Sequence, residues 1–415
     1  MLIDGLSHGS AVQAAAAAYV GRLEQLVDLC IAVQQIPAPT GAEAERAAWI
    51  EKRMRAIGLA DVERDKLGNV YGRVCGPRAQ DRPALLVSAH TDTVFPPETD
   101  LRLRRLEKGL IRGPGIGDNS TGVAGLLTLA ETLTQLAPPP VDIWLVANSM
   151  EEGVGDLRGM RRVVDRLAAQ TNEASRKVGP SRNGRGALGA VIVLEGMGLG
   201  RIVHQALGAR RYRTSAAAPG GHSWGDFGAA SAVHGLVLLA SDLVKLQVPQ
   251  TPRTTFNIGR IGGGTSVNSI AQEAWMELDL RSESPETLAW LDEQIGQIVE
   301  RHAQAHSAHN DGLTLRHEQI GNRPAGGLPF RHPLVQAAST ILQELGVKER
   351  SDGRISSTDA NVPLSRNIPA VCVGLTDGGD AHRLSEWIDP LPLVKGMQQL
   401  LYLTWWSAAW LTKSG

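Results

Sequence analysis

The sequence has few cysteines, and they are far apart. Three occur in 415 residues, namely Cys30, Cys75 and Cys372. They form no Cys-x-x-Cys pair, and any disulfide scheme leaves one thiol over. Secreted domains of the disulfide-stapled kind are therefore excluded, and the cysteine content predicts a reducing, cytoplasmic compartment.

The chain also has almost no net charge. Its 42 Lys and Arg residues are balanced by 43 Asp and Glu residues, which leaves −1 at pH 7. Binding to nucleic acid or to an acidic membrane surface relies on an excess of positive charge. We therefore expect no nucleic-acid partner and no membrane partner, and an enzyme acting on a small molecule or a short peptide fits the balance.

Long hydrophobic segments are missing as well. The first residues, Met1-Leu2-Ile3-Asp4, lack the basic start of a signal peptide. The apolar stretch around Trp405 is interrupted by Lys395 and Gln398 and is short for a membrane span. We expect this stretch to form a helix that packs into the core.

The length and the order of sequence patterns predict two domains. A chain of 415 residues exceeds what one ordinary core accommodates. Short apolar runs typical of buried parallel strands occupy residues 83–89, 141–147 and 188–194. Helical spacing is found at residues 43–57, followed by Gly58 as the predicted C-terminal cap, and at residues 119–136, for which Asn119-Ser120-Thr121 is the predicted N-cap. The polar stretch 165–186 is predicted to be a surface insertion.

A different pattern begins near residue 202. It predicts, in order, a strand at 202–218, a helix at 229–246, strands at 255–261 and 271–281, a helix at 285–306 and a strand at 313–320. This βαββαβ order is that of a split-βαβ, ferredoxin-like domain. After residue 321 the earlier character returns, with a helix at 333–345, a strand at 369–374 and a final helix. We predict a catalytic α/β domain (residues 1–203 and 319–415) interrupted by an α+β lid domain (residues 204–318).

Potential metal ligands follow the predicted strands of the outer domain. They are His90, the pair Glu151-Glu152, Glu195 and His382, and Asp118 joins them from Gly115-Ile116-Gly117-Asp118-Asn119 at the start of a helix. Open α/β sheets bind ligands outside the carboxyl ends of their strands. Taken alone, the His-x-Asp pattern of His90 and Asp92 is explained by a local hydrogen bond, and the Glu151-Glu152 pair by a solvated turn. Their joint occurrence predicts a metal centre.

The residue types suit two zinc ions. Two histidines and three carboxylates form two sites if one carboxylate bridges, and manganese or cobalt could replace zinc. Asp118 is the expected bridge because glycine next to it lets the backbone come close to both ions. Asp92 is expected to accept the second N–H of His90. Since adjacent side chains of an extended segment diverge, we expect one of Glu151 and Glu152 to be a ligand and the other to be the base.

The sequence resembles the aminoacylase / peptidase T / glutamate carboxypeptidase group of dinuclear zinc hydrolases, over roughly three hundred residues. The matching pieces are Ser88-Ala89-His90-Thr91-Asp92-Thr93-Val94, Gly115-Ile116-Gly117-Asp118-Asn119, Met150-Glu151-Glu152-Gly153, Gly220-Gly221-His222-Ser223 and Ala381-His382. The resemblance implies a zinc-exopeptidase-like catalytic domain. It also implies that one ion is held by His90, Asp118 and Glu195, and the other by Asp118, Glu152 and His382. Glu151 is then the general acid/base and Asp92 the residue behind His90.

The inserted domain contributes three further candidates. The resemblance implies that His222 stabilises the oxyanion, often across a homodimer interface formed by the lid. Asn268 and Arg281 resemble lid residues that bind substrate. The alternatives are a polar residue in a Gly-rich turn for His222, turn chemistry for Asn268 and an ion pair with Asp279 for Arg281. Ser357-Thr358-Asp359 resembles a loop near the active site with no role specified, and His302, His306 and His309 are expected to be solvated.

The predicted function is metal-dependent hydrolysis of an amide bond in short peptides by an exopeptidase of the dipeptidase, tripeptidase or carboxypeptidase type. The first alternative is a deacylase or amidohydrolase acting on N-acyl or N-carbamoyl amino acids. The second is a binding module without catalysis. The presence of Glu151 and of a complete ligand set argues against the binding module.

Overall fold

The computed structural model describes residues 9–77, 82–176, 188–350 and 354–413. The chain divides into two compact units, Met1–Gln205 with Gly327–Gly415, and Ala206–Gly326. The second boundary lies eight residues beyond the expected position of 318. The reason is that β15 (Thr314–Arg323) continues to pair with β10 as far as Arg323, opposite Ala209.

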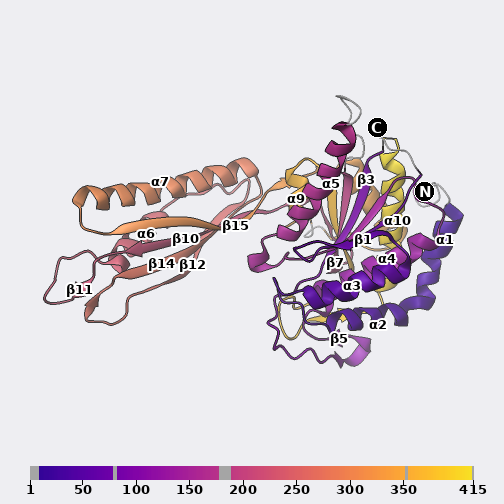
Figure 1. The fold of residues 1–415 in the computed structure, drawn as a ribbon, viewed down its shortest axis with the longest axis horizontal. Helices are drawn as coiled ribbons and strands as arrows, with labels where there is room; N and C mark the ends of the chain where they lie inside the picture. The colour runs from indigo at the N-terminus through magenta and orange to yellow at the C-terminus, as the bar shows by residue number, and fades with distance from the viewer. Residues whose placement is uncertain (1–8, 78–81, 177–187, 351–353, 414–415) are drawn as a thin grey trace. The chain divides into compact units, whose positions relative to one another are not determined.

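The first unit is built on a mixed sheet that has ten strands among the described residues (Figure 1). Its centre consists of parallel strands in the order β6 (Ile143–Asn148), β3 (Ala84–His90), β7 (Leu188–Met197) and β18 (Ala370–Gly379). All of β6 and all but the first residue of β3 are buried, as expected for parallel strands covered on both faces. On the β6 side the sheet continues with β2 (Val70–Val74) and β1 (Ala60–Arg64). On the β18 side it continues with β19 (Trp387–Asp389), β5 (Ile111–Arg112) and β4 (Arg104–Arg105).

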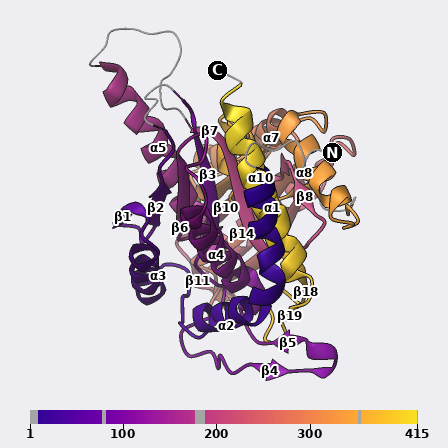
Figure 2. The same ribbon diagram turned by 90° about the vertical axis from the view of Figure 1, so that its right-hand side faces the viewer.

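Helices cover both faces of this sheet. On one face α4 (Gly122–Gln135) and α10 (Leu393–Leu411) pack into a shared core with the alternate residues Leu85 and Val87 of β3 (Figure 2). On the other face α5 (Arg158–Arg176) contacts β6 and β7. Trp405 is fully buried, which confirms the prediction of a core-packing final helix. The remaining helices of this unit are α1 (Gly9–Ala18), α2 (Leu23–Gln34), α3 (Ala44–Ile57), α8 (Pro333–Glu344) and α9 (Asn361–Ser365).

One local prediction in this unit was wrong. The helix expected from Asn119 begins at Gly122, after the short helical segment η3 (Ile116–Thr121). The expected capping side chains bind elsewhere, because Asn119 Nδ2 donates to the Leu194 carbonyl at 2.9 Å and the Thr121 hydroxyl donates to the Ile116 carbonyl at 2.7 Å. The expected surface insertion is helical in its first part, since α5 runs to Arg176, and residues 177–187 lie outside the described residues.

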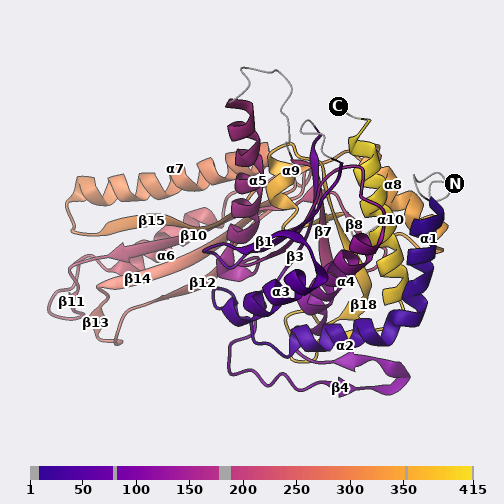
Figure 3. The same cartoon turned by 45° about the vertical axis from the view of Figure 1, so that its right-hand side comes forward.

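The second unit is a four-stranded antiparallel sheet with two helices on one face (Figure 3). Along the chain its elements are β10 (Gly208–Ala217), α6 (Ala232–Leu243), β12 (Thr254–Gly263), β14 (Glu273–Ser282), α7 (Pro285–His309) and β15, and the sheet order is β12-β14-β10-β15. This is the ferredoxin-like arrangement that the sequence predicts. The start of α7 shows how sequence sets it: the Ser284 hydroxyl accepts the Thr287 N–H at 3.1 Å, and Pro285 occupies the first turn.

The segments that join the two units are short strands. The strand expected at 202–218 is broken into β8 (Ile202–Val203), β9 (Gln205–Ala206) and β10. β9 pairs with β16 (Gly326–Gly327) and β17 (Ile355–Ser356) in a small sheet. Among the described helices, none is both long and apolar enough to cross a membrane. Cys30, Cys75 and Cys372 are all free thiols.

Candidate metal centre

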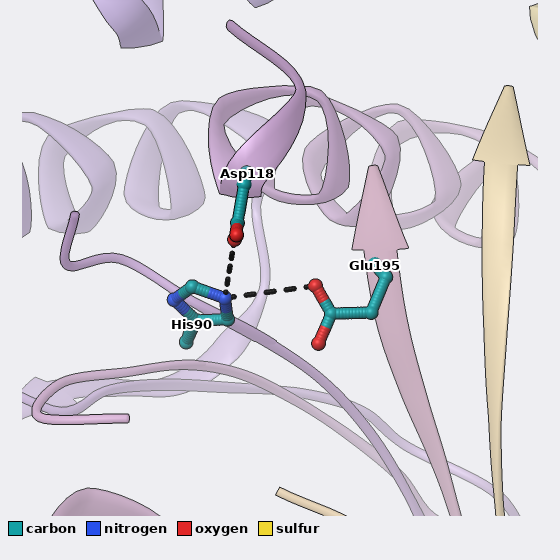
Figure 4. Close-up of side chains that lie close together, drawn as sticks. All are labelled: His90, Asp118 and Glu195. Carbon is teal, nitrogen blue, oxygen red and sulfur yellow. Dashed lines mark ion pairs between the residues drawn. The ribbon is translucent and has the colours of Figure 1, made fainter. Parts of the chain in front are cut away.

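His90 lies at the end of β3 and faces two carboxylates from other elements (Figure 4). Its Nε2 is 3.1 Å from Asp118 Oδ1 and 3.6 Å from Glu195 Oε2. Asp118 belongs to η3 and Glu195 to β7, so three separate chain segments bring these atoms together. The His90 side chain is 2% exposed, which removes it almost completely from water.

Asp118 also faces a second histidine. The Nε2 atom of His382 is 3.0 Å from Asp118 Oδ2 and 3.0 Å from Glu152 Oε1. The two oxygens of one carboxylate are therefore directed at two different histidines. A bridging carboxylate between two ions has this arrangement.

Two groups of side chains meet at Asp118, one with His90 and Glu195 and the other with Glu152 and His382. The distances between their nitrogen and oxygen atoms suit a metal ion held between them better than direct contact. His90 Nδ1 lies 3.1 Å from the Asp92 carbonyl oxygen and 3.5 Å from Asp92 Oδ1, so Nδ1 is the nitrogen that donates. In the neutral ring the lone pair of Nε2 then points at carboxylate oxygens, and only a cation or a proton between them is favourable. Two ligands of a tetrahedral zinc ion are about 3.3 Å apart for bonds near 2.0–2.1 Å. The observed separations of 3.0 to 3.6 Å match that spacing.

The electrostatic surroundings also favour an added cation. Within the described chain the ion-pair partners of Asp118, Glu152 and Glu195 are histidines and not lysine or arginine. Asp118 Oδ1 is buried and has no hydrogen-bond partner in the described chain. Burial raises the pKa of Glu195. Contacts with Asp118 and then Glu152 raise the pKa of His382 to about 10, and burial of His90 is outweighed by its carboxylate neighbours, which raise its pKa well above the ordinary value.

Glu151 and Glu152 are both buried, with 5% and 7% exposure. Together with His90 they form a third set of ligand atoms within 4.8 Å of one another. Glu152 also belongs to the set with Asp118 and His382, whereas Glu151 does not. The segment is fixed by a left-handed backbone at Met150, with φ of 57°, a strained conformation of the kind found at functional sites.

Asp92 holds both the histidine and the glutamate pair. Its Oδ1 accepts the Glu151 N–H at 2.9 Å, and its Oδ2 accepts the Glu152 N–H at 2.8 Å and the Thr40 hydroxyl at 2.9 Å. The side chain is completely buried. Asp92 therefore accepts the His90 Nδ1–H through its backbone carbonyl, and its carboxylate fixes the backbone that carries both glutamates.

Sequence reasoning missed Glu386, which binds the backbone of the Asp118 loop. Its carboxylate accepts the N–H groups of Gly117 at 2.7 Å, Asp118 at 2.8 Å and Gly115 at 3.2 Å. Burial raises its pKa to about 7. Glu386 acts on backbone N–H groups, and its only signal in the sequence is its position four residues after His382.

Asp359, from the Ser-Thr-Asp loop, is also buried near this centre. Asn148 lies opposite His90 in the pairing of β6 with β3, and its Nδ2 donates to Asp359 Oδ2 at 2.6 Å. Burial raises the pKa of Asp359 to about 7. The loop thus places a carboxyl group directly behind the strand ends that carry the candidate ligands.

In the second unit, His222 lies in a tight loop with a defined ring orientation. It ends β11 (Gly221–His222), which pairs with β13 (Ser269–Ile270). The backbone N–H groups of Trp224 and Gly225 donate to His222 Nδ1 at 3.2 and 3.3 Å, and the His222 N–H donates to Asp226 Oδ2 at 2.7 Å. Because Nδ1 accepts, Nε2 carries the proton of the neutral ring and is available as a donor.

The other two candidates of this unit, Asn268 and Arg281, have different surroundings. Asn268 lies beside the His222 loop, since its carbonyl accepts the Ser223 N–H at 3.1 Å. Arg281 on β14 forms an ion pair with Asp279 at 2.6 Å, the alternative that the sequence left open. Arg211 contacts the same carboxylate at 3.1 Å, so two guanidinium groups share one negative charge. Their roles towards a substrate stay predictions.

The histidines expected to be solvated do not gather into a further site. His302 pairs with Asp242 at 2.9 Å and His306 with Asp311 at 2.7 Å. The candidate metal clusters of the described residues include none of His302, His306 and His309.

Comparison with known proteins identifies the family. The sequence pattern of peptidase family M20/M25/M40 matches residues 86–405, and the chain belongs to this family. It is therefore a hydrolase of the metallopeptidase and amidohydrolase class, as the resemblance of its motifs implied. A curated relative, succinyl-diaminopimelate desuccinylase of Corynebacterium glutamicum, is 26% identical over 85% of this chain and 88% of its own length.

Solved structures have the same fold. A tripeptidase from Staphylococcus aureus superposes with a TM-score of 0.72 at 20% identity, covering 93% of this chain and 99% of that one. A dinuclear metal-binding peptidase of family M20 from Bacillus subtilis gives a TM-score of 0.62 at 17% identity, covering 93% and 98%. These likenesses concern the fold, and the substrate has to be inferred from the site.

Proposed function

We propose that the first unit binds two divalent metal ions, zinc in the first instance, with Asp118 as the bridging ligand. His90 and Glu195 would complete one site, and Glu152 and His382 the other. The observation that carries this proposal is the Asp118 carboxylate, whose two oxygens lie 3.1 and 3.0 Å from two different histidine nitrogens. Manganese or cobalt could serve, because sites of this type discriminate weakly among first-row ions.

Glu151 is the proposed general base. Bound ions would polarise the scissile carbonyl and make a water molecule acidic enough to lose a proton near neutral pH. Glu151 takes that proton and returns it to the leaving amine. Its buried carboxylate belongs to the cluster with His90 and Glu152 but not to the set around His382, which supports a base beside the ions rather than a shared ligand. Asp92 keeps Glu151 in place through the backbone N–H.

His222 is the proposed oxyanion donor. Its Nδ1 accepts two backbone N–H groups, so the neutral ring presents Nε2–H to a substrate oxygen. We propose that it acts within a lid formed by residues 206–326, either in its own chain or across a homodimer. Asn268, next to this loop, and Arg281 would bind the substrate's carbonyl or carboxylate groups.

The proposed substrate is a short peptide with a free carboxylate close to the scissile amide. The fold shared with the S. aureus tripeptidase supports a peptide. The alternative is an N-acyl amino acid, and the 26% identity with a desuccinylase supports it. Both substrates present the same amide and a nearby carboxylate to the same metals and base, so only a direct comparison of substrates separates them.

The first test is metal content together with activity. Gently purified protein should contain close to two equivalents of a transition metal, and chelation should abolish activity until metal is restored. The screen should pair dipeptides and tripeptides with N-succinyl, N-acetyl and N-carbamoyl amino acids at equal concentration. Full activity in a preparation free of transition metal is incompatible with the proposal.

A further inference from the structure

A second candidate site lies in the first unit, in a cavity of about 640 Å³ beside the β4–β5 hairpin. Figure 2 shows both strands together at the lower edge of this unit. The cavity is lined by Arg102, Arg104 and Arg112, and its walls include Gly113 with Pro114 and Leu384 with Ser385. The lining contains a single acidic residue, Asp100.

Two of these arginines are placed against each other. Arg104 and Arg112 are direct partners in the antiparallel pairing of β4 with β5, so their side chains leave the same face of the hairpin. Like charges directly opposite on neighbouring strands destabilise a sheet. Arg102 is neutralised, because its guanidinium forms two hydrogen bonds with Asp100 Oδ2 at 2.8 and 2.6 Å.

Neither Arg104 nor Arg112 has such a partner. Within the described residues no ion pair or hydrogen bond engages either guanidinium, and Arg112 Nε is buried without an acceptor. A buried unsatisfied donor on a charged group is costly. An oxyanion between the two guanidinium groups would relieve both the repulsion and the missing acceptor, since arginine binds carboxylate and phosphate with paired hydrogen bonds.

The walls of this cavity are continuous with the segments that carry two candidate ligands. Gly113 and Pro114 precede the loop of Asp118, while Leu384 and Ser385 follow His382. The two walls are joined, because the Gly113 N–H donates to the Glu386 carbonyl at 2.8 Å. A group bound in the cavity would therefore contact the same backbone that positions Asp118 and His382.

We propose that Arg104 and Arg112 form a binding site for a carboxylate or phosphate group. The shared chemistry is a small oxyanion, which has two sources. It is either an acidic group of the substrate itself, a reading that rests on the proposed hydrolase function, or a separate anion that binds beside the metal centre.

The first experiment measures binding without catalysis. Inorganic phosphate is titrated into the metal-loaded protein, with sodium chloride at equal ionic strength as the reference, and both heat and melting temperature are recorded. The variants are Arg104→Gln and Arg112→Gln. Arg105→Gln is the matched control, because Arg105 lies on the same strand, pairs with Ile111 and does not line the cavity. Any phosphate bound at the metals is common to all four proteins and cancels.

Phosphate should bind and raise the melting temperature of the wild type and of Arg105→Gln, and affinity should fall roughly tenfold or more in the two cavity variants, the loss expected for one charged hydrogen bond. Kinetics then separate the sources, using peptide pairs that differ by Glu against Gln. A preference for Glu that disappears in the cavity variants identifies a substrate group, whereas an unchanged preference with lost phosphate binding identifies a separate anion. Equal phosphate binding and equal preference in all four proteins overturn the proposal. If the protein hydrolyses no amide, the proposed function is refuted. The phosphate measurement still decides whether Arg104 and Arg112 bind an oxyanion.

Discussion

The candidate metal centre and the His222 loop differ in how far the chain itself completes them. At the metal centre His90 is 2% exposed and Asp92 and Glu386 are fully buried, and hydrogen bonds hold each of them, whereas the His382 side chain is 53% exposed. In the His222 loop and the neighbouring turn, Trp224 and Phe227 are 89% and 91% exposed and Val267 is 104% exposed.

This difference distinguishes a preorganised site from a loop whose apolar side chains are left exposed by its own unit. Groups held by buried contacts keep their geometry before substrate arrives, which is the condition for efficient electrostatic catalysis. Exposed aromatic side chains cost free energy in water and gain it only when covered, at about 25 cal/mol per Å² of apolar surface. Under the proposed function, the substrate or a second copy of the chain would cover the His222 loop.

The largest effect is expected for a variant of the candidate metal centre. Glu151→Gln should lower kcat by ~10²–10⁴-fold, the range for loss of a general acid–base group. Metal content should stay near two equivalents, because Glu151 is not assigned as a ligand. Glu152→Gln is the matched control and should instead lose metal from one site, as measured by elemental analysis. The opposite behaviour of the two variants would show that ligand and base have been exchanged.

His222→Ala should lower kcat by ~10²–10³-fold, the cost of removing one oxyanion donor, and leave metal content and melting temperature unchanged. The reason is that the side chain is exposed and that, among the described residues, its ring accepts hydrogen bonds from Trp224 and Gly225 of its own loop. Mixing this variant with inactive Glu151→Gln chains tests whether sites are shared. Activity should return if His222 acts across a dimer, whereas no rescue after demonstrated subunit exchange places it in its own chain.

Amidation of the C-terminus of a good peptide substrate should lower kcat/KM by roughly tenfold. A fully buried charge pair would lose ~2–5 kcal/mol when one partner is removed. The expected effect is smaller here because the Arg281 side chain is 42% exposed and already contacts Asp279. Arg281→Ala should erase the difference between the free and the amidated peptide. Equal cleavage of both peptides by the wild type would rule out a carboxylate contact by Arg281.

The smallest effect concerns stability. Trp224→Ser should change the free energy of unfolding by no more than ~0.5 kcal/mol, as for surface positions in general, because the side chain is almost fully exposed. The same variant should raise KM or weaken dimerisation if the loop is completed from outside. Urea denaturation and sedimentation measure the two properties separately. A large loss of stability would mean that the loop is covered in the isolated chain.

Much of this organisation could be predicted from the sequence because it depends on local patterns. Continuous apolar runs identify the parallel strands, and the residues that end them, such as His90 and Glu195, have to meet at one edge of the sheet. The ferredoxin-like unit follows from the order of its elements. His90, Glu152, Glu195 and His382 come together because they lie at or near the carboxyl ends of the parallel strands, whereas Asp118 joins them from η3.

The missed features depend on register and on backbone groups. Glu386 accepts three backbone N–H groups, which leave no pattern in the side chains. The pairing of Arg104 with Arg112 is invisible until the hairpin register is known. The helix expected at Asn119 starts later because Asn119 binds the Leu194 carbonyl, a partner 75 residues away in the chain.

The pairing of β9 with β16 has an evolutionary consequence. The chain enters the second unit at Gln205–Ala206 and leaves it at Gly326–Gly327, and these two strands are neighbours in one small sheet. An insertion whose two ends lie side by side can be lengthened, shortened or exchanged without separating the strands that flank it. Residues 206–326 thus form a unit that selection could lengthen, shorten or replace without disturbing the strands that carry the candidate metal ligands.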